Sequence, residues 1–105
     1  MNERRCVLIL FFDLPVQTGK QRKAYREFRK ELLRSGYLCF QESVYVKLLK
    51  NRASVAAELL AVDRISPEDG TVDVLPVSLN RFTAMALIRG NRFDMSLFAD
   101  DLIFL

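Results

Sequence analysis

The stretch VLILFFDLP, Val7 to Pro15, decides how the rest of the chain is organised. It contains six consecutive apolar residues, Val7 to Phe12, followed directly by the carboxylate of Asp13. A short continuous apolar run is typical of a strand buried on both faces, since a half-exposed strand alternates between apolar and polar residues. The β-branched and aromatic side chains favour a strand over a buried helical segment, and Pro15 ends it. We therefore predict a central strand that brings Asp13 to the rim of the core, where rigid scaffolds commonly present charged groups.

Length and composition indicate one globular domain. Half of the 105 residues are hydrophobic and 28% are charged, which excludes a disordered chain and allows a single core. We expect one domain over residues 1–105, with a core at about 1–78 and a C-terminal extension for dimerisation or partner binding at 79–105. No apolar run approaches the roughly 18–20 residues that span a bilayer. No signal peptide is recognisable either, so we expect a cytoplasmic protein with no membrane partner.

The chain has no histidine, and this restricts its chemistry. Imidazole general bases, Ser–His and Cys–His pairs and the usual zinc ligand sets are excluded. Catalysis would have to use carboxylates, metal-bound water, lysine or arginine. Cys6 and Cys39 lie in apolar stretches, and we expect two buried thiols in a reducing compartment.

A basic helix and an extended segment follow the central strand. Apolar residues recur at helical spacing over residues 20–35, with Thr18 as the N-cap and Gly36 as the C-terminal stop. Residues 37–49 are rich in apolar and aromatic side chains, partly in alternation, which predicts either one bent strand or a hairpin.

A second helix and a last strand complete the pattern. The helix is expected at about residues 52–62, with Asn51 as its N-cap. The residues expected to face inward on it are Val55, Ala56, Leu59 and Leu60. The strand is expected at residues 71–77, and Pro76 places it at a sheet edge or a strand end. The order β-α-β-β-α-β is that of the α+β ferredoxin-like sandwich.

This fold predicts a dimer. Both helices of a ferredoxin-like domain cover one face of the sheet and leave the other face open, yet the first strand is apolar on both faces. In the last strand Leu75 and Val77 are also out of phase with Val72 and Val74. An exposed apolar face of that size requires a partner. We predict a sheet-to-sheet twofold homodimer with exchanged C-terminal strands, because the apolar residues 102–105 are suited to extending a neighbouring sheet.

Dimerisation gives Asp13 a possible chemical role. One carboxylate cannot build a site for a hard cation, but two copies of Asp13 facing each other across the axis could. Two close carboxylates resist ionising together unless a cation lies between them. Mg²⁺, or Mn²⁺ in its place, could activate a water there for phosphodiester attack without histidine. Asp13 is thus the predicted catalytic residue and metal ligand; the alternative is a residue that only starts a turn or caps a helix.

The predicted first helix is strongly basic. Residues 20–34 carry seven basic and two acidic side chains, a charge of +5 against +3 for the whole chain. A dimer would double this into a band of about +10, which would bind a phosphate backbone without reading its sequence. The predicted nucleic-acid contacts are Lys20, Arg22, Lys23, Arg26, Arg29 and Lys30, extended by Lys47, Lys50 and Arg52. The alternative is an ordinary solvated helix face.

Four segments together resemble a known family. They are VLILFFDLP at residues 7–15, RKAYREFRKELLRSGY at 22–37, QESVYVK at 41–47 and GTVDVLPVS at 70–78. In this order they resemble the Cas-two family, the small CRISPR-associated endonuclease of spacer acquisition, and more specifically the form that accompanies Cas-nine systems.

The resemblance implies more than the composition does. Members are ferredoxin-fold homodimers whose strand-end Asp, matched by Asp13, binds magnesium between protomers, and whose C-terminal strand is exchanged. They are metal-dependent nucleases that act on RNA or duplex DNA, and they bridge two dimers of the Cas-one integrase while holding protospacer DNA. Two alternatives remain at this point: a catalytically silent scaffold of the integration complex, and a ribonuclease toxin of the same fold that resembles the virulence-associated D family.

Overall fold

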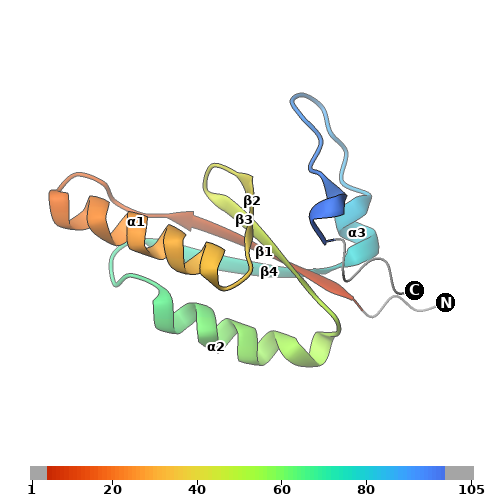
Figure 1. The fold of residues 1–105 in the computed structure, drawn as a ribbon, viewed down its shortest axis with the longest axis horizontal. Coiled ribbons are helices and arrows are strands. Elements are labelled where there is room, and N and C mark those ends of the chain that lie inside the picture. Colours follow the sequence, from red (N-terminus) through yellow and green to blue (C-terminus); the bar gives the residue numbers. More distant parts are fainter. Residues whose placement is uncertain (1–4, 99–105) are drawn as a thin grey trace.

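Strand β1, Cys6–Asp13, lies in the middle of a four-stranded antiparallel sheet in the computed structural model, which describes residues 5–98 (Figure 1). Its neighbours are β3, Val44–Leu49, on one side and β4, Thr71–Ser78, on the other. Strand β2, Leu38–Gln41, lies outside β3, so the strand order is β2-β3-β1-β4. The predicted central strand is confirmed, and the Pro76 strand is at an edge as expected.

Two helices cover one face of this sheet (Figure 1). Helix α1 spans Gly19–Arg34, and helix α2, Val55–Ile65, follows a 3₁₀ turn, η1, at Arg52–Ser54. The predicted Thr18 cap is confirmed, since its hydroxyl accepts from the Gln21 N–H at 3.0 Å. Asn51 accepts from the Ser54 N–H at 3.2 Å but caps the turn η1, whereas the N-cap of α2 itself is Ser54, without a side-chain hydrogen bond. The element order and the strand order together confirm the α+β ferredoxin-like fold.

The extended segment is a hairpin rather than one bent strand. Strands β2 and β3 pair antiparallel around Glu42 and Ser43, with an irregular register between Cys39 and Gln41. The expectation of two buried thiols is wrong for one of them. Cys6 is buried in β1, whereas Cys39 is exposed on β2, the outermost strand of the sheet.

The inward face predicted for α2 is also largely wrong. Ala56, Leu59 and Leu60 are exposed, and only Val55 among the predicted residues packs on the core. The side chains that face the sheet are Val55, Glu58, Val62 and Ile65. The helix is rotated relative to the expectation because Glu58 is drawn inward by two partners on the sheet side, Tyr37 and Lys47.

Side chains of β1 contribute to two cores. The core on the helix side contains Leu8, Leu10, Phe12, Phe28, Leu32, Tyr45 and Val62. The core on the opposite face, here called the far face, contains Val7, Ile9, Val46, Leu48, Leu79, Phe82 and Phe98. The last three of these come from the C-terminal extension, from helix α3, Leu79–Thr83, and the 3₁₀ turn η2, Met95–Phe98.

The expectation that the far face is open is therefore wrong for half of it. The chain packs its own extension against Val7 and Ile9. Figure 1 shows α3 at this end of the sheet. No strand occurs between residues 79 and 98, and the apolar residues 102–105 lie outside the described residues, so the exchanged C-terminal strand stays a prediction. In the part of the chain from 5 to 98, no helix has the length and apolar character needed to cross a membrane.

Candidate functional site

Asp13 is the last residue of β1, and its side chain is exposed on the far face. Successive side chains of a strand point to opposite faces, so Asp13 lies on the same side as Val7 and Ile9. Phe12, the residue before Asp13, points to the opposite face and packs into the helix-side core. The alternation of β1 thus turns the carboxylate away from α1 and α2, towards the surface on which a second sheet would pack.

A second carboxylate shares this part of the far face. In the β1–β4 register Phe11 is opposite Asp73, and Asp13 is opposite Thr71, which places Asp73 diagonally across from Asp13. Such diagonal neighbours have Cα atoms about 7–8 Å apart. Asp73 was not among the site residues predicted from the sequence, although it lies two residues before Leu75 and so on the same face of the strand.

Apolar side chains surround the two carboxylates. Phe11 is 39% exposed and Leu75 is 50% exposed, because the described part of the C-terminal extension, residues 79–98, packs on the other end of the sheet. We call Phe11, Asp13, Asp73 and Leu75 the acidic–apolar patch. A patch that mixes large exposed hydrophobic groups with carboxylates is typical of a surface that is covered in an assembly.

One chain alone does not build a complete metal site. Among residues 5–98 no group of three or more His, Cys, Asp or Glu side chains lies close enough to hold an ion. Mg²⁺, however, usually retains several waters and is bound through one or two carboxylates. An exposed, acceptor-only carboxylate such as that of Asp13 fits this requirement when a second copy supplies the other oxygen ligand.

The loop that follows Asp13 is anchored by hydrogen bonds from side chains in the first turn of α1. The Gln21 side-chain oxygen accepts from the N–H groups of Gln17 and Thr18 at 2.9 and 3.0 Å. The Arg22 guanidinium donates to the carbonyls of Val16 and Gln17, both at 3.2 Å. The first turn of α1 therefore fixes the chain a few residues after the carboxylate.

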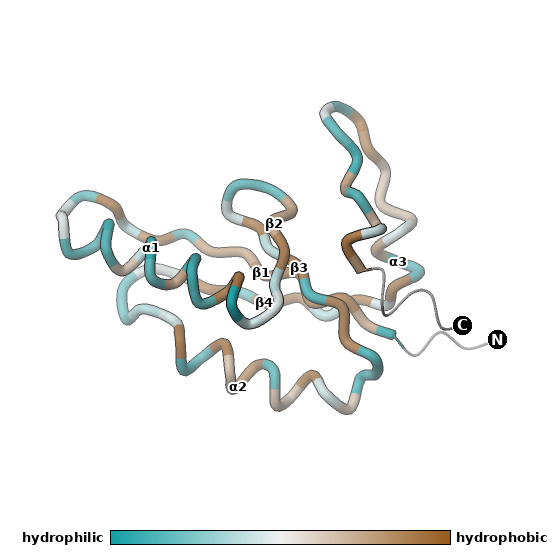
Figure 2. The backbone as a smooth tube through the Cα atoms, in the orientation of Figure 1, coloured by the Kyte–Doolittle hydropathy of each residue, from teal (hydrophilic) through white to brown (hydrophobic). Residues whose placement is uncertain are grey.

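The basic side chains of α1 lie on the molecular surface, and Figure 2 shows the helix as mostly hydrophilic along its length. All six predicted contact residues within it are exposed: Lys20, Arg22, Lys23, Arg26, Arg29 and Lys30. Arg34 forms an ion pair with Glu31. Arg22 has an additional structural role in the loop, so Lys23, Arg26 and Lys30 are the cleaner probes of an electrostatic function.

The three residues predicted to extend the basic band differ from one another. Lys50 and Arg52 are exposed. Lys47 is partly buried, forms an ion pair with Glu58 at 2.8 Å and lies 5.4 Å from the centre of the Tyr37 ring. It fits the predicted phosphate contact poorly, because its charge is neutralised inside the protein.

Tyr37 completes this buried network. Its hydroxyl donates to the second Glu58 oxygen at 3.0 Å. Burial raises the pKa of Tyr37 well above its ordinary value, and the Glu58 charge and hydrogen bond raise it further. Tyr37 therefore stays a neutral donor, and the network joins α2 to the sheet.

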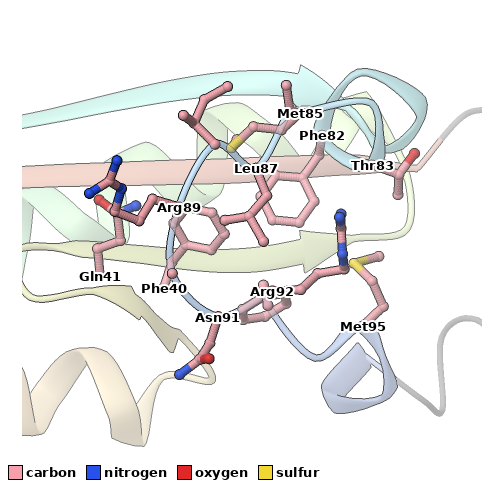
Figure 3. A pocket seen from close by; sticks show the side chains of 14 residues that line it. Phe40, Gln41, Phe82, Thr83, Met85, Leu87, Arg89, Asn91, Arg92 and Met95 are labelled. Carbon is pink, nitrogen blue, oxygen red and sulfur yellow. The ribbon is translucent and has the colours of Figure 1, made fainter.

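A cavity of about 720 Å³ lies between β2 and the projecting loop after α3 (Figure 3). Phe40, Phe82 and Phe93 form its aromatic wall, with ring centres 5.4–5.9 Å apart. Among the described residues that line it, Arg89 and Arg92 are charged and none is acidic. These residues supply no carboxylate to a metal ion, unlike the strand end at Asp13.

Comparison with known proteins identifies the family. The family model for CRISPR associated protein Cas2 matches residues 6–85, from β1 to just after α3. The chain belongs to the Cas2 family. The match includes all four strands of the Cas2 fold and both long helices, whereas most of the loop lining the cavity lies beyond it.

Known proteins of the same family are similar in sequence to this chain over most of their length. A protein of Streptococcus mutans is 40% identical over 85 residues, which cover 81% of this chain and 79% of the relative. A protein of Flavobacterium psychrophilum is 36% identical over 93 residues, 88% and 81% of the two chains. A protein of Treponema denticola is 39% identical over 83 residues, 79% and 82%. Each is named a CRISPR-associated endoribonuclease Cas2.

The predicted family is thereby confirmed, and Cas2 membership excludes the toxin family as its alternative. The names of the relatives also agree with the predicted endonuclease. The roles of Asp13 and of the basic residues stay predictions.

Proposed function

We propose that this chain is an endoribonuclease subunit of CRISPR adaptation that acts as a twofold homodimer and depends on Mg²⁺ or Mn²⁺. The observation that carries the proposal is the position of Asp13, exposed at the end of the central strand within the acidic–apolar patch. The names of its Cas2 relatives support the reaction class.

The acidic–apolar patch supports a dimer in which two sheets meet through their far faces. Burying Phe11 and Leu75 against a second copy would remove two large apolar groups from water, each worth about 1–2 kcal/mol at their present exposure. The same contact would bring the two Asp13 carboxylates together. Their mutual repulsion would oppose association unless a cation lay between them, which couples metal binding to dimer stability.

In this arrangement Asp13 provides oxygen ligands, and the chain has no histidine that could act as a general base beside it. A bound divalent cation would lower the pKa of a water and offset phosphate charge during hydrolysis. The basic face of α1, on the other side of the sheet, would hold the phosphate backbone by charge alone. Backbone contacts of this kind do not select a sequence, so RNA and duplex DNA would both bind.

The same features support the wider role that the family resemblance implies. Two α1 helices would give a band of about +10 (two copies of +5), suited to holding protospacer DNA while the dimer bridges two dimers of the Cas-one integrase. A catalytically silent scaffold is the second candidate, favoured by the small number of carboxylates near Asp13 in one chain.

The proposal is tested by cleavage of labelled RNA and duplex DNA with Mg²⁺, Mn²⁺ or EDTA. We expect metal-dependent cleavage by the wild type and a loss of about 100-fold or more in Asp13→Ala, with the fold and dimer retained. Asp69→Ala, an exposed carboxylate in the turn before β4, is the matched control and should cleave normally. Equal cleavage by wild type and Asp13→Ala, or none by either, would refute the enzyme and leave the scaffold.

A further inference from the structure

Gly70 lies directly against the backbone of Asp13 and leaves no room for a side chain. Its φ is +94°, a conformation that L side chains rarely adopt. A Cβ atom at this position would be 2.6 Å from the Asp13 carbonyl oxygen, 2.9 Å from Leu14 Cδ2 and 3.0 Å from Leu14 Cα. Two of these three atoms belong to the backbone, which cannot move aside as a flexible side chain would.

We infer that Gly70 is a positioning residue for Asp13: the absence of its side chain lets the turn before β4 close onto β1 and sets the direction of the carboxylate. This inference rests on the proposed function, in which the Asp13 side chains of two copies meet. Gly70 immediately precedes Thr71, the partner of Asp13 at the end of the β1–β4 ladder. Its contact therefore acts at the last point where the sheet still holds Asp13.

The chain after Asp13 cannot easily absorb a displacement. Leu14 is buried, and the hydrogen bonds from Gln21 and Arg22 to residues 16–18 hold the loop from the other side. A side chain at position 70 would push on the Asp13 carbonyl while the loop stays fixed. The peptide of Asp13 would then rotate, and the carboxylate would move with it.

A twofold site makes such a movement costly. Metal–oxygen distances at a Mg²⁺ site are about 2.0–2.1 Å and tolerate shifts of only about 0.2 Å. In a symmetric dimer the displacement occurs in both copies, so the separation of the two carboxylates changes by up to twice the shift in each chain. Gly70 should therefore affect metal binding more than nucleic-acid binding.

The chain offers two matched controls with positive φ. Gly36, with φ +95°, would place its Cβ no nearer than 3.6 Å from an atom of the flexible Lys47 side chain. Gly90, with φ +106°, has no atom within 4 Å of that position. Alanine at either site incurs the same kind of backbone strain as at Gly70 but leaves Asp13 untouched.

The test compares Gly70→Ala with Gly36→Ala and Gly90→Ala in the full chain. Backbone amide resonances of Asp13 and Leu14 should shift only in Gly70→Ala. In RNA cleavage titrated with Mn²⁺, Gly70→Ala should need at least about 10-fold more metal for half-maximal rate. Its RNA dissociation constant measured in EDTA should stay within twofold of the wild type, and both controls should match the wild type in each measurement.

Unshifted amides of Asp13 and Leu14 together with unchanged metal dependence in Gly70→Ala would overturn the inference. If the wild type does not cleave, or if Asp13→Ala does, the proposed function is wrong instead. The amide shifts of Asp13 and Leu14 then decide separately whether Gly70 positions Asp13. If Gly70→Ala does not fold, the same measurements apply to Leu14→Ala/Gly70→Ala against Leu14→Ala. That pair relieves the contact with Leu14 Cδ2 and keeps the one with the Asp13 carbonyl.

Discussion

Glu58 is a single acidic side chain that sets the orientation of a helix. It accepts a hydrogen bond from Tyr37 and forms an ion pair with Lys47, and both partners come from the segment that contains β2 and β3. Glu58 and Lys47 are each about one-fifth exposed, so water screens their interaction less than that of a surface pair. The apolar residues Leu59 and Leu60 remain outside as a consequence.

Tyr37→Phe should weaken this network and change the pH dependence of stability. Loss of the hydrogen bond to Glu58 should lower the free energy of unfolding at pH 7 by about 1–2 kcal/mol. The pKa of Tyr37 is raised in the folded state, so the unfolded chain loses this proton first, near pH 10, and stability falls as the pH rises further. Urea unfolding between pH 7 and 11 should show a shallower alkaline loss in Tyr37→Phe. An alkaline loss as steep as that of the wild type would contradict this role; Tyr25→Phe is the control for removing a hydroxyl elsewhere.

Helix α1 carries seven of the sixteen basic residues of the chain and has a net charge of +5. Among its described residues, Arg34 forms an ion pair with Glu31, Arg22 donates to the preceding loop, and Arg29 interacts with the Tyr45 hydroxyl. The side chains of Lys20, Lys23, Arg26 and Lys30 are exposed, and their combined charge would attract a phosphate backbone more than any single one of them does.

Lys23, Arg26 and Lys30 changed together to Gln should weaken duplex binding and flatten its salt dependence. If all three contact phosphates, the slope of log K against log salt should decrease in magnitude by about 2–3. The control changes the exposed Arg64, Arg89 and Arg92 to Gln and has the same net charge. Fluorescence anisotropy from 50 to 300 mM salt measures both variants. Equal slopes for the two would show that net charge, and not the α1 face, governs binding.

At the scale of the whole molecule, residues 79–98 of the C-terminal extension cover one end of the far face, and within the described residues the acidic–apolar patch at the other end is exposed. The uncovered end contains the side chains through which the proposed dimer would form, including Leu75, which is half exposed. Residues 79–98 already cover the end of the far face that contains Val7 and Ile9. A dimer contact would therefore be centred on Asp13 rather than spread over the entire sheet.

Leu75→Glu should convert the proposed dimer into a folded monomer. The side chain is exposed in one chain, so the charge costs little in folding, but burying it at an interface without a partner would cost several kcal/mol. Light scattering at micromolar concentration should give twice the chain mass for the wild type and the chain mass for Leu75→Glu. Leu60→Glu, an exposed leucine on the outer side of α2, should stay dimeric. A monomeric wild type would remove the dimer from the proposal.

The sequence by itself determined the central strand, both long helices, the Thr18 cap of the first helix, the Asn51 cap of the turn that leads into the second, and the exposed Asp13 at the strand end. These features depend on local patterns: a continuous apolar run, helical periodicity, and side chains that bond backbone groups two or three residues away. They are present before any long-range contact forms, and the order of such elements was sufficient for the fold.

Tertiary structure decided the features that join distant segments. The rotation of α2 depends on Glu58 meeting Tyr37 and Lys47, and no periodicity reveals that an acidic residue will face the sheet. The cover over half of the far face, the pairing that brings Asp73 beside Asp13, and the contact of Gly70 with the Asp13 backbone likewise arise from chain segments far apart in sequence. Each is set by packing and register, which exist only when the sheet has assembled.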